Sequence, residues 1–200
     1  MSPTAPPLGR RERNKQEKLE RITRAASDLF SRHGVDEVTT QQIAEAADVG
    51  AGTLFLYART KGELLLLVQN ANYARSLDRG VRDAAGLADL VDAVIALITP
   101  IVECNRAQVE NGRTYLREMV FGDPAEPHHA EALSIVARTE QALVEVISSR
   151  AEVDDDAAAR LAHVVSSLQF VAMASVADES VSVAEIVADV RAHLELVLPR

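Results

Sequence analysis

Several residue types that define particular protein classes are scarce in this sequence. Cys104 is the only cysteine among 200 residues, so no disulfide can form within the chain, and a reducing cytoplasm is expected. No run approaches the ~18 consecutive apolar residues of a membrane span. The N-terminal stretch lacks the apolar segment of a secretory signal. We therefore expect a cytoplasmic globular protein with no membrane partner.

The patterns of common catalytic and metal sites are also missing. A single cysteine cannot build a cysteine-rich zinc site, and there is no P-loop, dinucleotide-binding glycine pattern or Ser-His-Asp arrangement. Two minor alternatives stay open. His128 and His129, with Glu126 and Glu131, could hold a cation, although adjacent histidines in a loop usually lie at the surface. Cys104 could act as a redox switch. We predict that the protein is not an enzyme and uses no cofactor or metal.

Strand signals are scarce, whereas helical periodicity is strong. The first nine residues include three prolines, which excludes a regular helix there, and we expect residues 1–13 to form a disordered arm. From about Asn14, apolar residues return at the spacing of one helix face, and Gly34 is placed to end that helix. These apolar residues are Leu19, Ile22, Ala26, Leu29 and Phe30.

Two short helices with a tight turn between them are predicted next. Thr39 or Thr40 caps the segment TQQIAEAA, and Asp48-Val49-Gly50 forms the turn. The segment AGTLFLY follows, with Leu54 facing inward, and a longer apolar helix covers residues 61–79. A short helix, a turn of about three residues and a second short helix indicate a helix-turn-helix.

The remaining residues also show helical patterns. We expect helices over 89–104, 112–121, from 127 or 130 to 150, from about 154 to 177, and 183–198. Pro100 should kink or end the first of these. Three acidic residues, Asp154 to Asp156, suit the start of the fourth. The fold class is therefore all-α, with about nine helices.

Charge is distributed unevenly along the chain. The net charge is −9, which alone argues against a nucleic-acid partner. Residues 1–62, however, hold ten Lys and Arg against eight Asp and Glu, whereas the remainder holds eleven against twenty-two. This asymmetry is typical of a DNA-binding domain attached to an acidic body, although a charge block is often only solvated surface.

Residues 19–67 contain a series of short motifs at fixed spacing. In chain order the motifs are AA..LF, G, TT..IA, V, GTL, Y, K and L. In this register the segment resembles the N-terminal domain of TetR-type (TetR/AcrR) transcriptional repressors. The C-terminal body resembles that family only in length and helicity. The matching residues are Ala25, Ala26, Leu29, Phe30, Gly34, Thr39, Thr40, Ile43, Ala44, Val49, Gly52, Thr53, Leu54, Tyr57, Lys61 and Leu64.

The resemblance implies a set of DNA contacts. The N-terminal residues of a recognition helix meet base edges, and small residues there allow close approach to the duplex. Because Leu54 faces inward, its neighbours Phe55 and Tyr57 are expected to face DNA. Thr39 is better explained as a helix cap, Lys61 has the alternative of an ordinary surface lysine, and Arg10, Arg11 and Arg13 could follow the DNA or merely be solvated. The predicted DNA-binding residues are Thr40, Gln41, Ala51, Gly52, Thr53, Phe55, Leu56, Tyr57 and Lys61.

Four positions depart from the family pattern. Asp48 replaces the turn glycine and is tolerable because Asp enters the left-handed region more readily than most residues. Gly50 replaces the capping Ser, at a cost of a few tenths of a kcal/mol. Phe55 replaces a Tyr, so its hydroxyl is absent. Ala58 replaces an aromatic, which leaves less core beneath the motif.

The resemblance also implies a homodimer, because one recognition helix reads only a few base pairs. The last two helices, 156–177 and 183–198, are the expected dimer contact, with the alternative that they only complete the monomer core. Small side chains there would permit close helix approach. They are Ala157, Ala158, Ala159, Ala162, Ala172, Ala174 and Ala177.

An inducer pocket among the middle helices follows from the same resemblance. Such sites are mostly apolar with a few polar anchors, and the low aromatic content of 4% favours an aliphatic pocket. Each candidate has the alternative of ordinary core packing. The candidates are Cys104, Arg106, Tyr115, Met119, Phe121, Gln169, Phe170 and Met173.

The resulting prediction is a ligand-responsive transcription repressor. Residues 14–62 would bind a palindromic operator, and residues 63–200 would bind a small-molecule inducer and a second copy of the chain. The ligand would move the helix that follows Lys61 and so change the separation of the two DNA-reading heads. The alternatives are an all-α binding or scaffold protein with a vestigial DNA head and, less favoured, a small helical enzyme.

Overall fold

The computed structural model describes residues 9–199, and they form nine helices and no strand. The predicted all-α class and helix number are confirmed. Residues 1–8 of the predicted arm lie outside the described residues. Residues 10–13, assigned to that arm, instead form the first turn of α1, so this helix begins four residues before Asn14. The last proline of the arm is Pro7, and nothing in the segment RRER prevents helix formation.

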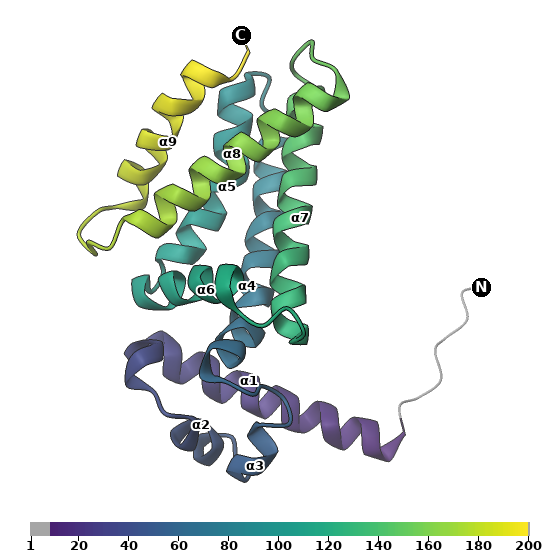
Figure 1. The fold of residues 1–200 in the computed structure, drawn as a ribbon, viewed down its shortest axis with the longest axis vertical. Coiled ribbons are helices and arrows are strands. Elements are labelled where there is room, and N and C mark those ends of the chain that lie inside the picture. The colour runs from purple at the N-terminus through teal and green to yellow at the C-terminus, as the bar shows by residue number, and fades with distance from the viewer. Residues whose placement is uncertain (1–8, 200) are drawn as a thin grey trace.

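Helices α1 (Arg10–Glu37), α2 (Thr40–Ala46) and α3 (Ala51–Leu54) form the lower layer of the molecule (Figure 1). Gly34 interrupts α1 with a φ of 76°, a left-handed conformation that glycine adopts without steric cost. Val35 and Val38 can then turn back into the core, where both are buried. The N-terminal half of α1 projects beyond the rest of the molecule.

Helix α3 is shorter than predicted, because it ends at Leu54 rather than Tyr57. Beyond it the amide of Leu56 bonds to Thr53 O at 3.2 Å, and that of Tyr57 bonds to Leu54 O at 2.9 Å. These i to i+3 bonds tighten the backbone into a turn. Ala58 can thereby become buried below the motif.

Six helices form the body above this layer. They are α4 (Lys61–Ala84), α5 (Leu90–Arg106), α6 (Val109–Phe121), α7 (Pro127–Ser148), α8 (Asp155–Ser175) and α9 (Val183–Val197). The α4 helix extends five residues past the predicted end at Arg79. It runs from the lower layer into the body, so the two parts share one continuous helix (Figure 1).

Pro100 does not end α5, contrary to one of the two predicted outcomes. The helix continues for six more residues to Arg106. Proline removes one backbone hydrogen bond, but its neighbours Ile98, Ile101 and Val102 are all buried in the core. Packing of these side chains therefore holds the helix together across the proline.

Among the described residues, α8 alone is long and apolar enough to cross a membrane by length and composition. This is weak evidence, because core helices meet the same criterion. Here α8 packs against α7 on one side and α9 on another. The apolar residues of α8 line a cavity on one side of the helix and form an exposed face on the other, and both are described below.

Candidate DNA-reading surface and ligand cavity

The start of α2 is fixed by a reciprocal pair of hydrogen bonds. The amide of Gln42 donates to Thr39 Oγ1 at 3.2 Å, and the amide of Thr39 donates to Gln42 Oε1 at 2.8 Å. Thr39 is therefore the N-cap, as predicted, within a capping box. Thr40 is the first helical residue, and Gln41 is exposed with its amide donating to Glu45.

The turn between α2 and α3 depends on Asp48. Its φ of 51° places it in the left-handed region, and it is the only non-glycine residue described with a positive φ. Its carboxylate pairs with Arg21 of α1 at 3.0 Å. Asp at the family's glycine position therefore keeps the turn geometry, as predicted.

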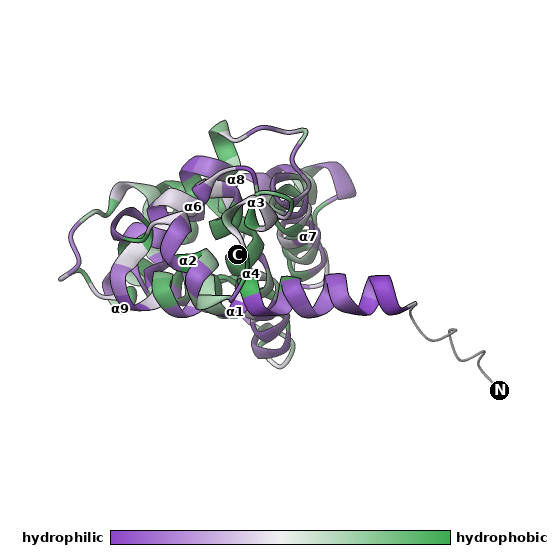
Figure 2. Ribbon diagram, turned by 90° about the horizontal axis from the view of Figure 1, so that it is seen from below, coloured by the Kyte–Doolittle hydropathy of each residue, from purple (hydrophilic) through white to green (hydrophobic). Residues whose placement is uncertain are grey.

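Helix α3 and the turn after it lie at the lower end of the molecule, which Figure 2 shows from below. Leu54 is 1% exposed and faces the core, as predicted. Phe55 is 45% exposed and Leu56 is 82% exposed. Gly52 is exposed as well, while Ala51 and Thr53 are half-buried. Exposed apolar side chains are costly in water, so a surface that carries them suits contact with a partner.

Two predicted DNA ligands also hold the domain together. The Tyr57 hydroxyl donates to the carbonyl oxygen of Lys15 at 3.2 Å. The Lys61 ammonium donates to the carbonyl oxygen of Asp36 at 3.1 Å, next to the end of α1. Both side chains are half-buried rather than fully exposed. A DNA-contact role for either stays a prediction, and each has a packing role that sequence reasoning missed.

A polar cluster joins this domain to the body. The imidazole Nε2 of His128 lies 3.1 Å from the carbonyl oxygen of Tyr57, in the turn that follows α3. The His128 amide donates to Glu63 Oε1 at 2.8 Å. Arg59 forms an ion pair with Glu126 at 3.1 Å. The first turn of α7 thus contacts the segment between α3 and α4.

The two histidines therefore do not lie in a surface loop, as their sequence context suggested. His129 is 4% exposed, with Nε2 3.1 Å from the carbonyl oxygen of Met119. The described residues contain no cluster of three or more potential metal-ligating side chains. Burial raises the pKa of Glu63, although the hydrogen bond from the His128 amide opposes this. These residues connect the start of α7 to α6 and α4.

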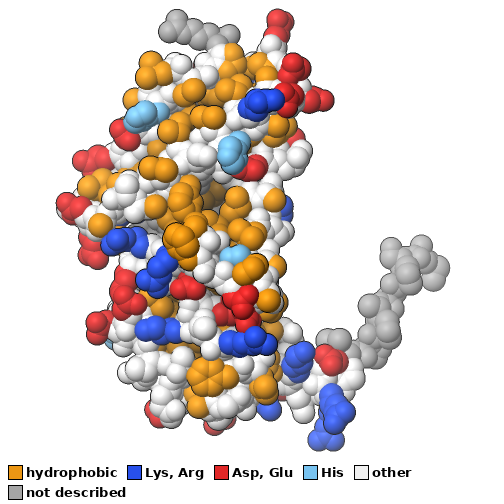
Figure 3. Space-filling view, in the orientation of Figure 1, with side chains coloured by type: hydrophobic (Ala, Val, Ile, Leu, Met, Phe, Trp, Pro, Cys, Tyr) orange, Lys and Arg blue, Asp and Glu red, His pale blue; other side chains and the backbone are white. Residues whose placement is uncertain are grey.

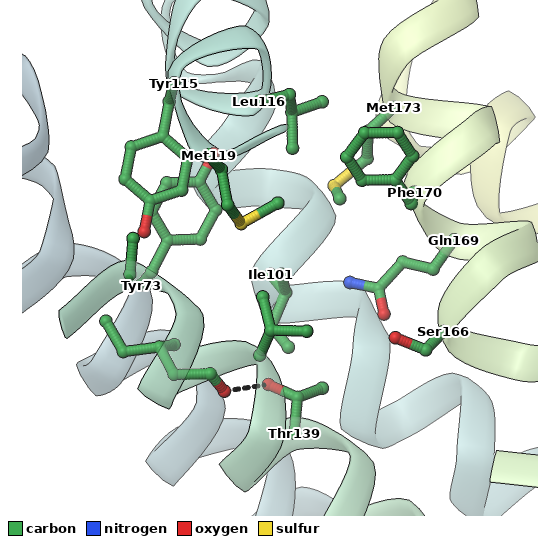
Figure 4. A pocket seen from close by; sticks show the side chains of 13 residues that line it. Tyr73, Ile101, Tyr115, Leu116, Met119, Thr139, Ser166, Gln169, Phe170 and Met173 are labelled. Atoms are coloured by element: carbon green, nitrogen blue, oxygen red, sulfur yellow. Dashed lines mark hydrogen bonds between the residues drawn. The ribbon is translucent and has the colours of Figure 1, made fainter. Parts of the chain in front are cut away.

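An apolar cavity of about 70 Å³ lies inside the body between α4, α5, α6, α7 and α8 (Figure 4). Five of the predicted ligand residues line it together. They are Tyr115, Met119, Gln169, Phe170 and Met173. Sequence reasoning missed the remaining lining residues, which are Tyr73, Ile101, Leu116, Ala132, Ile135, Val136, Thr139 and Ser166. Ser166 could have been found, since it lies on the same helical face as Gln169 and Met173.

Three predicted ligand residues lie elsewhere. Cys104 is in a separate cleft that Arg75 and Arg79 also line, and burial raises the pKa of its thiol. Phe121 is 83% exposed at the end of α6. Arg106 donates to the backbone carbonyls of Val176, Asp178 and Val181. Arg106 thus fastens the loop between α8 and α9.

Two tyrosines close one side of the cavity. The rings of Tyr73 and Tyr115 stack with centroids 4.2 Å apart. Tyr115 donates to Asn70 Oδ1 at 2.9 Å, and Asn105 donates to the Tyr73 hydroxyl oxygen at 3.0 Å. Burial raises the pKa of both phenols. Asn70 in turn donates to the carbonyl oxygen of His128, so the cavity wall is linked to the polar cluster.

Two of the seven alanines predicted to permit close helix approach at the dimer contact are not at the surface. Ala158 and Ala162 are fully buried within their own chain and are unavailable to a second copy. The apolar residues that point outward are instead larger, and Val164 and Val171 are 38% and 60% exposed. Figure 3 shows apolar side chains gathered over this part of the body. We call the stripe formed by Leu161, Val164, Leu168 and Val171 the α8 outer face.

The arrangement of α1 to α3 defines the class of protein. Two short helices joined by a tight turn, with the second exposed and set on a helical body, constitute a helix-turn-helix DNA-binding protein. Residues 22–68 match the family model described as bacterial regulatory proteins, tetR family. No curated protein matches the chain by sequence.

Solved structures share the fold across almost the whole chain. A TetR transcriptional regulator from Rhodococcus sp. RHA1 aligns with a TM-score of 0.71 and 18% identity, covering 92% of this chain and 97% of that one. Thermus thermophilus FadR, a TetR-family repressor in complex with lauroyl-CoA, aligns with a TM-score of 0.68 and 23% identity, covering 91% and 96%. The fatty acid degradation regulator FadR from Bacillus halodurans aligns with a TM-score of 0.60 and 16% identity, covering 90% and 99%.

The N-terminal domain therefore matches the tetR family of bacterial regulatory proteins, and the chain shares the fold of solved TetR regulators along almost its whole length. Members of this family are DNA-binding transcriptional regulators rather than enzymes, in agreement with the prediction.

Proposed function

We propose that this protein is a cytoplasmic homodimeric repressor that binds a palindromic operator and is released by a small-molecule ligand. The observation that carries the DNA-binding part is the exposed α3 region, where Phe55 and Leu56 stand free of the core. An operator reader must present such a surface to the major groove. Residues 14–62 would form the DNA-binding domain, and residues 63–200 would form the ligand-binding and dimerisation domain.

The contacts of α7 provide a route between ligand and DNA. The cavity wall includes Tyr115, which bonds to Asn70, and Asn70 bonds to His128. His128 then contacts the backbone of Tyr57 at the DNA-reading turn. A ligand that shifts this cavity wall would therefore change the position of the recognition helix relative to the body. Since both half-sites must be met in register, a small shift would favour release from DNA.

One solved neighbour and the cavity of this chain support ligand control. Thermus thermophilus FadR shares this fold and was solved with lauroyl-CoA. The present chain has a mostly apolar cavity within the corresponding helical body. Apolar interiors with a few polar side chains are the usual form of small-molecule sites.

A duplex-binding experiment tests the proposal. Operator candidates would be selected from random duplexes with the full chain, and binding would be followed by fluorescence anisotropy at several salt concentrations. We expect selected sequences with two-fold symmetry and steep weakening by salt, because phosphate contacts release counterions. Binding that is independent of salt, or selection without any consensus, would favour the scaffold alternative.

The variant Phe55→Glu should reduce affinity for the selected duplex at least about tenfold, because it places a negative charge against phosphates. Phe121→Glu is the matched control, since Phe121 is also an exposed phenylalanine but lies at the end of α6. Equal effects of the two variants would contradict an α3 reading surface.

A further inference from the structure

Two polar side chains of the cavity, Gln169 and Ser166, make no hydrogen bond with the described part of the chain. Gln169 is 4% exposed, and among residues 9–199 its amide makes no hydrogen bond. Figure 4 shows this amide directed into the cavity from α8, with the Ser166 hydroxyl beside it. An amide that faces a cavity without a hydrogen bond from the protein becomes more favourable when another group bonds to it. A bound molecule is the group that would do so.

The other polar groups around the cavity are already engaged. Thr139 donates to the carbonyl oxygen of Ile135 at 2.9 Å. The Tyr73 oxygen accepts from Asn105, and the Tyr115 hydroxyl donates to Asn70. Polar recognition is therefore concentrated at Gln169 and Ser166. The opposite side is formed by thioether and hydrocarbon side chains, which offer only apolar contact.

No charged side chain lines the cavity within the described part of the chain. A carboxylate or ammonium buried there would be unpaired, which is far more costly than burial of a neutral polar group. The adjoining groove shares Leu116 and Phe170 with the cavity. Two arginines line that groove, but three acidic residues line it as well, so it offers no net positive charge to an anionic group. These residues are Arg113, Arg117, Asp36, Glu110 and Glu179.

We propose that the ligand is an uncharged amphiphile, an aliphatic chain that ends in a single neutral hydrogen-bonding group such as a carboxamide, ketone or alcohol. This inference rests on the proposed function and names the ligand class of the same cavity. The Gln169 amide and the Ser166 hydroxyl bind the polar group, and the chain lies against the apolar side. The polyanionic headgroup of an acyl-CoA, the ligand of the Thermus thermophilus neighbour, finds no net positive charge in this cavity or in the groove that adjoins it.

The ligand would contact α8, the helix that we also propose for dimer contact. Ser166, Gln169 and Met173 face the cavity. Val164 and Val171 lie on the opposite side of the same helix, in the α8 outer face. A hydrogen bond to Gln169 thus acts on α8 without an intervening element.

Binding of a matched set of ten-carbon ligands tests the proposal. The full chain would be titrated with decanamide, 1-decanol, sodium decanoate and decylammonium at about pH 8, where the last two are charged, and with lauroyl-CoA. Isothermal titration calorimetry would measure affinity. We expect decanamide or decanol to bind at least about tenfold more tightly than either charged analogue and lauroyl-CoA. Equal or tighter binding of decanoate or lauroyl-CoA would overturn the neutral class.

The variant Gln169→Met keeps the side-chain length and removes the amide. We expect decanamide affinity to fall at least about tenfold, weak decanoate binding to stay unchanged, and the melting temperature without ligand to rise, because an unsatisfied polar group is removed. The control is Gln141→Met, whose side chain is exposed on α7 and should alter none of these measurements. Unchanged decanamide affinity in Gln169→Met would overturn the role of Gln169.

Duplex binding separates this inference from the function on which it rests. If the chain shows salt-dependent duplex binding but no neutral ligand of the set binds, the ligand class is wrong and the regulator function stands. If duplex binding itself is absent, the proposed function fails regardless of the titrations. Release of the selected duplex by decanamide but not by decanoate would support both.

Discussion

The conformation of Asp48 is a residue-scale device that the DNA-binding domain needs. A φ of 51° at the turn brings α3 across α2, and a Cβ in this region normally carries a steric cost. Asp reduces that cost relative to most residues and adds an exposed ion pair with Arg21. An exposed ion pair contributes little to stability. The tolerance of Asp for a positive φ is therefore the larger effect at this position.

Two substitutions separate these effects. Asp48→Ala and Asp48→Gly both remove the pair with Arg21 and differ only in their tolerance of positive φ. We expect the Ala variant to be about 1 kcal/mol less stable than the Gly variant, measured by urea denaturation. Equal stability would mean that the turn relaxes to another conformation.

Glu63 provides a second residue-scale prediction, this time of pH dependence. Burial raises its pKa, so the folded chain holds this proton more tightly than the unfolded chain. The resulting stabilisation is present below the unfolded pKa and is lost as pH rises through the folded value. Relative to Glu63→Gln, the wild type should lose free energy of unfolding as pH increases from about 4 to 7.

Thermal or urea unfolding of both proteins across that pH range measures the difference. Gln keeps the acceptor for the His128 amide, so the comparison isolates the charge. A constant difference between the two proteins would show that the Glu63 carboxyl titrates alike in both states.

At the scale of helices, close packing between α4 and α5 is set by Gly80. A Cβ added there would lie 2.0 Å from the carbonyl oxygen of Leu97 and 2.8 Å from its carbonyl carbon. These are backbone atoms that cannot move aside without shifting a helix. We expect Gly80→Ala to destabilise the fold by about 2 kcal/mol, despite the better helix propensity of alanine. Urea denaturation measures the loss.

Gly86→Ala is the control, since nothing lies within 4 Å of its added Cβ and its φ is not positive. This variant should be neutral or slightly stabilising through the unfolded state. Equal stability of the Gly80 and Gly86 variants would show that α4 and α5 can separate at little cost.

Helices with local signals were predictable, and their spatial partners were not. The cap at Thr39 and the break at Gly34 depend on residues close by in the sequence. The start of α2 and the end of α1 could therefore be located from sequence. The continuation of α5 past Pro100 depends on side chains packed from other helices. His129 illustrates the same limit, because its burial depends on α6, which supplies the Met119 carbonyl.

The candidate cavity was partly predictable for the same reason. Gln169 and Met173 were identified as polar or soft residues within apolar helices, and they do line it. Cys104 has the same chemical character but lies in a cleft beside Arg75. Periodicity separates the faces of one helix, but it does not tell which neighbouring helix each face will meet.

For the whole molecule, the outer face of α8 sets the expected assembly. Val171 is 60% exposed at the C-terminal end of this apolar stripe, which a single chain leaves in contact with water. We expect Val171→Lys to convert the proposed dimer to a monomer in sedimentation experiments. Affinity for a two-fold symmetric duplex should then fall at least about a hundredfold, because the second reading head no longer binds at a high effective concentration.

Val81→Lys is the matched control, because Val81 is an exposed valine on α4 and lies outside the α8 outer face. It should keep both the dimer and the duplex affinity of the wild type. If Val171→Lys also remained dimeric, the two-fold contact would lie on another surface. The coupling of cavity to dimer through α8 would then fail, while recognition of a neutral ligand by Gln169 would still be decided by the titrations.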